Sequence, residues 1–278
     1  MANAKKENGA NGGGMMTGII IASCIVVGFL VWKFIMGAPG NFQNAEAMKS
    51  GAEAGAPIAG NYLGMVYKGG SIVPVLLGCL LMVIVFSFER FFVISKASGT
   101  GNLDKFMVSI QSNISQGNME DAIATCDKQK GSVANAIKSA LVKYQEVKKE
   151  GFNSEEASEM IHKEIEEATS LEMPMLEKHM TILSTLVSLG TLAGLLGTVT
   201  GMIKAFGALA SSGTPDQAML ANGISEALIN TATGISTSAL AIIMYNLFTS
   251  KIDTLTYSID EAGTAIVNSY RRMRGSIK

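Results

Sequence analysis

Long runs without a charged residue alternate with polar segments along the chain. Four of these runs approach or exceed the ~20 apolar residues that a helix needs to cross the hydrocarbon layer of a membrane. They are Met15–Trp32, Gly69–Phe88, Met180–Ile203 and Ala227–Ser250. The pattern predicts an all-α integral membrane protein with four transmembrane helices and with long helices that extend into the cytoplasm.

The first apolar run has two interpretations, because Lys5 and Lys6 precede it as the basic residues of a secretory signal peptide would. Its apolar stretch is longer than the ~7–15 residues usual in such a peptide. We therefore expect a retained, extra N-terminal transmembrane helix over residues 15–36.

The positions of cationic residues predict which side of the membrane each end of the chain occupies. They flank the first run, follow the second and follow the fourth, so all fall on one side if both termini are cytoplasmic, as the positive-inside rule requires. These cations are Lys5, Lys6, Arg90, Lys96, Lys105, Lys251, Arg271, Arg272, Arg274 and Lys278. A bacterial inner membrane is the expected location.

The orientation fixes a predicted layout. The N-terminal part comprises a cytoplasmic tail at 1–14, the extra helix at 15–36, a periplasmic segment with a short helix at 37–70 and a transmembrane helix at 71–94. A cytoplasmic helical domain follows at 95–179. The C-terminal part comprises transmembrane helices at 180–209 and 223–250, which a periplasmic turn at 210–222 joins, and a cytoplasmic C-terminal helix and tail at 251–278. Within that turn, Ser211–Pro215 is a tight-turn sequence and Asp216 is a predicted N-cap.

The segment 95–179 has a helical period, with apolar residues at Val133, Ile137, Ala140, Leu141 and Tyr144. Helices are predicted over Asn102–Ser115, Met119–Lys128 and Ser132–Lys149. Ser154 is predicted to cap a further helix that runs into the third apolar run and bends at Pro174. Glu89 and Arg90 are adjacent in sequence and are not expected to face each other; His162 and His179 are expected to be solvated or interface residues.

Polar side chains form stripes on the last two transmembrane helices only. Such stripes turn toward protein or water and away from lipid, so these helices are predicted to line an interior while the first two face lipid. The stripe on the third helix is Thr181, Ser184, Ser188, Thr191 and Thr198; on the fourth it is Glu226, Asn230, Thr233 and Thr237, with Thr231, Gly234 and Ser238 on the adjoining face.

Glycines recur every three or four residues on the third transmembrane helix, at Gly190, Gly194, Gly197 and Gly201. Small residues at this spacing allow the backbones of two membrane helices to approach closely. Helix packing is the simplest explanation for them.

Glu226 is the acidic residue of most interest, because a carboxylate at mid-bilayer costs about 2.5–3.5 kcal/mol on insertion scales. Two interpretations remain open. Glu226 forms a structural ion pair with Lys204, which flanks the same hairpin, or it belongs to an ion path.

Composition excludes several other functions. Hydrophobic residues make up 48% and charged residues 16% of the chain, and its net charge of −1 offers no general attraction for nucleic acid. Cys24, Cys79 and Cys126 stand far apart in sequence, without metal-ligand spacing, and are predicted to be reduced thiols. No nucleophile–base pair, phosphate loop or metal set is present, so neither an enzyme nor a cofactor is expected.

Two segments carry a family resemblance. Gly194–Met202 reads GLLGTVTGM and Gly223–Gly234 reads GISEALINTATG, and both are similar to signatures of the ExbB/TolQ/MotA proton-channel family, closest to ExbB-like subunits. Gly69–Pro74 followed by Glu89–Phe91 is a weaker match to the family's first span. The resemblance covers residues 60–255. The chain departs from the family at Thr191, where members often have proline. It also departs in having an added N-terminal span, Met15–Met36, because the family core has three spans.

The resemblance implies a homopentamer in which the helices at 180–209 and 223–250 line a pore around a dimer of a single-span, ExbD-like partner. That partner's membrane aspartate would carry the proton, beside Thr198 and Thr231. The implied function is a motor driven by the proton-motive force that acts on a TonB-like transducer. A TolQ-like or motility-related stator and a non-conducting membrane scaffold are the alternatives, and whether the ion is proton or sodium stays open.

Overall fold

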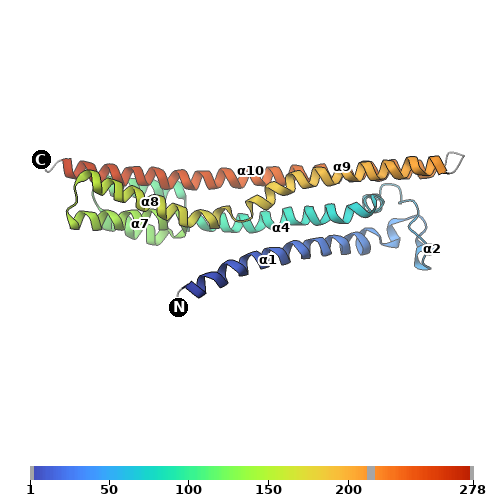
Figure 1. Cartoon of the computed structure of the whole chain (residues 1–278), viewed down its shortest axis with the longest axis horizontal. Coiled ribbons are helices and arrows are strands. Elements are labelled where there is room, and N and C mark those ends of the chain that lie inside the picture. Colours follow the sequence, from blue (N-terminus) through green and yellow to red (C-terminus); the bar gives the residue numbers. More distant parts are fainter. Residues whose placement is uncertain (1–2, 212–216, 276–278) are drawn as a thin grey trace. The chain divides into compact units, whose positions relative to one another are not determined.

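The structure is a computed structural model that describes residues 3–211 and 217–275. Those residues form long helices joined by short turns (Figure 1), and one isolated antiparallel bridge, between Phe42 and Pro57, is the only extended pairing among them. The predicted all-α class is confirmed. Apart from Ser211, which ends the helix Met180–Ser211, the predicted Ser211–Pro215 turn and the Asp216 cap lie outside the described residues.

The helices follow one another along the chain with mostly short connections. In order they are α1 Asn3–Leu30, a π-helix η1 Val31–Met36, a 3-10 turn η2 Pro39–Asn41, α2 Ala45–Lys49, α3 Tyr62–Tyr67, a 3-10 turn η3 Gly70–Ile72, α4 Val73–Ala97, α5 Leu103–Ser115, α6 Met119–Gln129, α7 Gly131–Glu150, α8 Ser154–Glu177, α9 Met180–Ser211 and α10 Gln217–Gly275.

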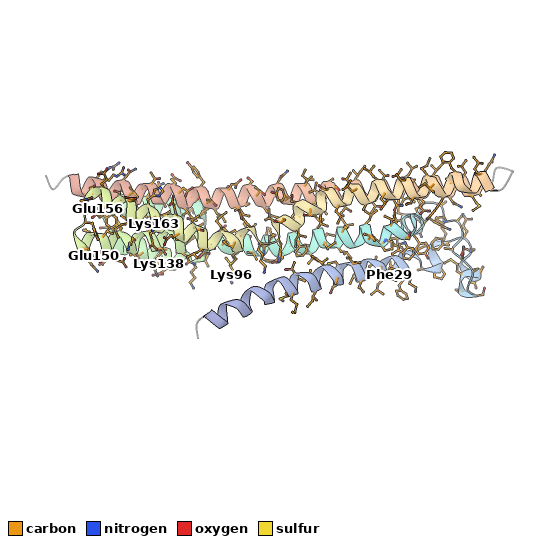
Figure 2. The ribbon with its side chains drawn as sticks, in the orientation of Figure 1. Phe29, Lys96, Lys138, Glu150, Glu156 and Lys163 are labelled. Atoms are coloured by element: carbon orange, nitrogen blue, oxygen red, sulfur yellow. The ribbon has the colours of Figure 1, made fainter. Side chains whose placement is uncertain are left out.

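Among the described residues, four helical segments are long and apolar enough to cross a membrane: Gly14–Met36, Gly70–Ala97, Ser154–Gly207 and Gln217–Met273. The chain is therefore a multi-pass membrane protein. Figure 2 shows that the labelled side chain of α1 is apolar, Phe29, whereas those of α7 and α8 are charged: Lys138, Glu150, Glu156 and Lys163. Charges on α7 and α8 are typical of helices in water.

Two compact units divide the chain. One contains the described residues through Ser87 together with Ile182–Met244, and the other contains Phe88–Thr181 with the described residues from Tyr245 onward. α10 contributes residues to both units. The predicted boundaries between membrane and aqueous segments stay predictions, because no membrane is present in the structure.

In the first unit, α1 runs alongside α4 (Figure 1), and each helix has a glycine at the contact, Gly28 on α1 and Gly78 on α4. A Cβ placed on Gly28 would lie 2.7 Å from the backbone nitrogen of Gly78, so only glycine allows this approach. Beyond α1, the Trp32 and Tyr67 rings stack with centroids 4.7 Å apart. The amide of Asn41 donates to the carbonyls of Ile35 and Met36, 2.8 Å away in each case. Residues 31–68 thus form a folded segment at the C-terminal end of α1.

The second unit is a helical bundle built from α5 to α8 and the C-terminal part of α10. Its core is apolar, and the rings of Tyr144 and Tyr270 meet edge to face with centroids 5.2 Å apart. The predicted amphipathic helices agree with α5, α6 and α7, and Asn102 caps α5 by accepting from the backbone N–H of Asp104 and Lys105. Fully buried members of the core include Ile110, Val133, Ile137, Leu141, Ile161 and Ile266.

Two expectations for α8 are corrected, namely its N-cap and its uninterrupted continuation into the third apolar run. Asn153, not Ser154, caps the helix, because its side chain accepts from the N–H groups of Glu155 and Glu156. α8 passes through Pro174 without ending. The helix instead breaks at Lys178 and His179, and His179 adopts a left-handed backbone with φ of 65°.

Glu89 and Arg90 hold this break, contrary to the expectation that they do not face each other. Arg90 Nη2 lies 2.7 Å from Glu89 Oε1, and Nη1 donates to the carbonyls of Met175 at 3.0 Å and Leu176 at 3.3 Å. The other carboxylate oxygen of Glu89 lies 2.5 Å from His179 Nδ1. The Arg90 side chain is only 1% exposed and that of His179 8%, so His179 is not solvated.

Cys24, Cys79 and Cys126 are free thiols, and all three are buried. Burial, with a smaller contribution from Asp127, raises the pKa of the Cys126 thiol to about 12. Since the thiolate is the reactive form, Cys126 is protected from thiol reagents both by its protonation state and by its position.

Candidate functional site

The candidate site is the α9–α10 pair, which the four predicted glycines hold together. A Cβ on Gly194 would lie 3.1 Å from the carbonyl oxygen of Asn230 and from Gly234 Cα, and one on Gly201 would lie 2.9 Å from the backbone nitrogen of Ala227. Conversely, a Cβ on Gly234 would lie 2.6 Å from the carbonyl oxygen of Gly190. Because these neighbours are backbone atoms, the two helices approach as closely as their main chains permit.

The surface of α9 divides into three arcs, at ~100° per residue. The first is the glycine arc, which is buried against α10 and contains Gly190, Gly194, Gly197 and Gly201. Next to it lies the hydroxyl arc of Ser188, Thr191 and Thr198, which also contains the exposed Leu195. The third, the apolar arc, is exposed and contains Leu192, Leu196, Val199 and Ile203. The hydroxyl arc therefore lies along one edge of the helix pair, between the packed face and the apolar face.

Thr198 and Thr231 meet at this edge. Their hydroxyls share a short hydrogen bond, and either oxygen can donate it. Each hydroxyl also reaches the carbonyl oxygen of Ala227, at 3.4 Å from Thr198 and 3.2 Å from Thr231. Both side chains are partly exposed. The pair is thus a small set of exchangeable hydrogen-bonding groups, with no charge of its own, open to one side.

A second hydroxyl contact lies further along the same edge. Thr191 Oγ1 donates to Ser238 Oγ at 2.9 Å, and Thr191 is exposed while Ser238 is 7% exposed. Ser188 is also exposed and Thr233, which donates to the carbonyl of Ile229, is partly exposed. The structure therefore brings together Thr191 with Ser238 and Thr198 with Thr231.

Two residues predicted to line a pore lie inside the subunit instead. Asn230 and Thr237 are both fully buried. The amide nitrogen of Asn230 donates to the carbonyl of Gly69 at 2.9 Å, and Thr237 donates to the carbonyl of Thr233. Within the subunit both side chains therefore pack between helices, although Asn230 Oδ1 has no hydrogen-bond partner there.

Lys204 and Glu226 form an ion pair, with 2.5 Å between Nζ and Oε1. The Lys204 side chain is 56% exposed and that of Glu226 15%. The pair lines the Glu226 cavity, an open cavity of about 260 Å³ whose other lining residues are Lys68, Met219, Asn222 and Gly223. Both earlier interpretations of Glu226 therefore remain compatible with the geometry, because an ion pair is present and the carboxylate faces an open cavity.

Sequence reasoning missed the contribution of residues 68–70. Gly70 has φ of 78°, and a Cβ there would collide with the carboxylate of Glu226. The two adjacent glycines were a visible signal of a chain break, but nothing local indicated that the break packs against α10. That contact joins residues far apart in the chain.

Comparison with known proteins finds a family match that includes this site. Residues 131–261 match the MotA/TolQ/ExbB proton channel family. A putative biopolymer transport protein, ExbB-like 3, from Synechocystis is 33% identical over 88 residues, which are 31% of this chain and 42% of that protein.

Two further relatives come from Pseudomonas. The Tol-Pal system protein TolQ of Pseudomonas aeruginosa is 34% identical over 105 residues, or 38% of this chain and 46% of the relative. The biopolymer transport protein ExbB of Pseudomonas putida is 33% identical over 86 residues, which are 31% of this chain and 26% of that protein. The chain thus spans less than half the length of each of these relatives.

Proposed function

We propose that this chain, whose residues 131–261 match the MotA/TolQ/ExbB proton channel family, is an ExbB-like subunit of an inner-membrane motor driven by the proton-motive force. Moving one charge through ~100 mV releases about 2.3 kcal/mol. A motor must let that charge pass along a polar path while lipid is kept out. The observation that carries the proposal is the partly exposed Thr198–Thr231 hydroxyl pair at the edge of two closely packed membrane helices.

The proposed assembly is a homopentamer in which the hydroxyl arcs of α9 surround a central passage. A dimer of a single-span, ExbD-like partner fills the passage and supplies the titrating carboxylate, since Thr198 and Thr231 carry no charge. Both termini are cytoplasmic, so that residues 37–68 and the Glu226 cavity lie on the periplasmic side. The downstream partner is a TonB-like transducer.

A TolQ-like role is the second candidate, and the 34% identity to TolQ of Pseudomonas aeruginosa favours it. The physical mechanism would be the same, and only the envelope machine driven by the motor would differ. A non-conducting scaffold is the rival of both, because a scaffold needs the glycine packing but has no use for the hydroxyls.

Replacing Thr198 or Thr231 with valine separates the motor from the scaffold. Valine keeps the shape and removes the hydroxyl, so proton flux through the chain reconstituted with its partner is expected to fall at least about tenfold, or 1.4 kcal/mol in the barrier. Flux is measured in proteoliposomes with a pH-sensitive dye, and assembly by size-exclusion chromatography. Thr198→Ser should recover flux.

The matched control is Ser236→Ala. Ser236 lies on α10, is exposed, and donates to its own helix at the carbonyl of Ala232, 2.8 Å away. This control should conduct as the wild type does. Undiminished flux in both valine variants, or loss of flux only where the assembly is also lost, would favour the scaffold.

A further inference from the structure

The carboxylate of Glu226 has close neighbours on two sides. On one side is the Lys204 ammonium, 2.5 Å from Oε1. On the other is the backbone at Gly70, where any side chain would collide with the carboxylate. The neighbouring Gly69 carbonyl accepts from the buried amide of Asn230, one turn along α10 from Glu226. The carboxylate therefore lies close to the backbone at Gly70 and has a cation already beside it.

The Glu226 cavity carries a net positive charge. Its ionisable lining residues are Lys68, Lys204 and Glu226, so two ammonium groups and one carboxylate give a formal charge of +1. Lys68 Nζ donates to the carbonyl of Ala54, 2.5 Å away, while Lys204 Nζ bonds Glu226. The two lysines thus differ in role although they line the same cavity.

This arrangement discriminates between two kinds of ion. An alkali-metal cation binds in a membrane path where oxygen ligands and uncompensated negative charge are available, as in the acidic rings of cation channels. Here an ammonium already neutralises the carboxylate. A proton needs no such coordination shell, because it moves between a carboxylate oxygen and hydrogen-bonded water.

We propose that Lys204 occupies the position beside Glu226 that a sodium ion would otherwise take, and so makes the Glu226 cavity selective for protons over sodium. The inference rests on the proposed ion-conducting function. It makes Lys204 a specificity-determining residue, and it gives the Glu226–Lys204 pair a role in the ion path as well as a structural one.

Sodium binding to the purified full-length assembly tests the inference without any need for conduction. Thermal unfolding is compared in NaCl and in choline chloride at the same ionic strength. The wild type should show no sodium-specific shift. Lys204→Met exposes the carboxylate, so its Tm should rise by about 2–4 °C in sodium, and adding Glu226→Gln to that variant should abolish the shift. Since Lys204 is 56% exposed, its replacement leaves the fold intact; Lys204→Gln serves as a second variant.

Two controls distinguish occupancy of the site from net charge. Lys68→Met removes the same charge from the cavity but not from Glu226, and should show no sodium shift. Lys204→Arg keeps a cation beside the carboxylate and should behave as the wild type does. A sodium shift in Lys68→Met equal to that in Lys204→Met, or no shift in either Lys204 variant, would overturn the inference.

Flux measurements keep this inference separate from the proposed function. In proteoliposomes with the partner, Lys204→Met should raise sodium permeability relative to proton permeability at least about tenfold. If the wild-type assembly passes no protons while Lys204→Met still gains the sodium shift, the proposed function fails and the sodium-exclusion role of Lys204 stands. If flux is normal but sodium neither binds to nor permeates Lys204→Met, the inference fails and the proposed function stands.

Discussion

Leucine in place of Gly234 is expected to abolish the folded α9–α10 pair and with it all activity. The Cβ alone would lie 2.6 Å from the carbonyl oxygen of Gly190 and 2.8 Å from Gly194 Cα. These are backbone atoms of a long helix, so no side chain can rotate away to make room. Overpacking a tight interface typically costs about 1–3 kcal/mol, and a rigid backbone contact should exceed that range.

Gly207→Leu is the matched control for this substitution. Gly207 lies on the same membrane helix, α9, but a Cβ there meets nothing within 4 Å. The yield of monodisperse, helical protein after detergent extraction measures both variants. Equal yields from Gly234→Leu and Gly207→Leu would contradict the close-packing account.

Methionine in place of Arg90 is expected to lower the free energy of unfolding by about 3 kcal/mol, because it removes one partner of a buried charged network. The carbonyls of Met175 and Leu176 at the end of α8 would lose their donor, and Glu89 would lose its cation. His179 would keep its contact with Glu89, but the end of α8 beside it would lose both Arg90 hydrogen bonds. Unfolding in mixed micelles with increasing dodecyl sulfate, followed by circular dichroism, measures the change.

Lys96→Met is the comparison for Arg90→Met. Lys96 lies on the same helix, α4, and is exposed, so its loss should change stability by no more than about 0.5 kcal/mol. His179→Gly tests the backbone separately, since glycine adopts positive φ without strain. If Arg90→Met is as stable as Lys96→Met, the network contributes nothing to the break between α8 and α9.

The sequence predicted those features that depend on periodicity within one helix. The four long apolar helices follow from uncharged runs, and the spacing of Gly190, Gly194, Gly197 and Gly201 indicated close packing before any contact was known. The Lys204–Glu226 contact was also foreseeable, because both residues flank one hairpin. In each case the relevant neighbours are near in sequence or share one helical face.

Features that depend on distant contacts were not predictable in this way. Asn230 and Thr231 are adjacent polar residues on α10. Asn230 is buried and donates to the carbonyl of Gly69, whereas Thr231 is partly exposed. Periodicity predicted that both residues line the same interior. It could not distinguish the face of α10 that packs against other helices from the edge that is partly exposed. Likewise, His179 gave no sign of a positive φ, because that conformation is sustained by Glu89 and Arg90 from another helix.

Thiol labelling of α9 tests the central claim most directly, because it reports which arc of the helix meets water. Cysteine is introduced singly at Ser188 or Thr191 in the hydroxyl arc, and at Leu196 or Val199 in the apolar arc, in membranes that contain the full assembly. The three native cysteines are buried, so background labelling should be low. The account predicts that a charged, membrane-impermeant methanethiosulfonate labels the hydroxyl-arc positions at least about tenfold faster than the apolar-arc positions, since the thiolate forms only where water reaches it. Faster labelling at Leu196 and Val199 than at Ser188 and Thr191 would place water on the apolar arc in preference to the hydroxyl arc and contradict the proposed ion path.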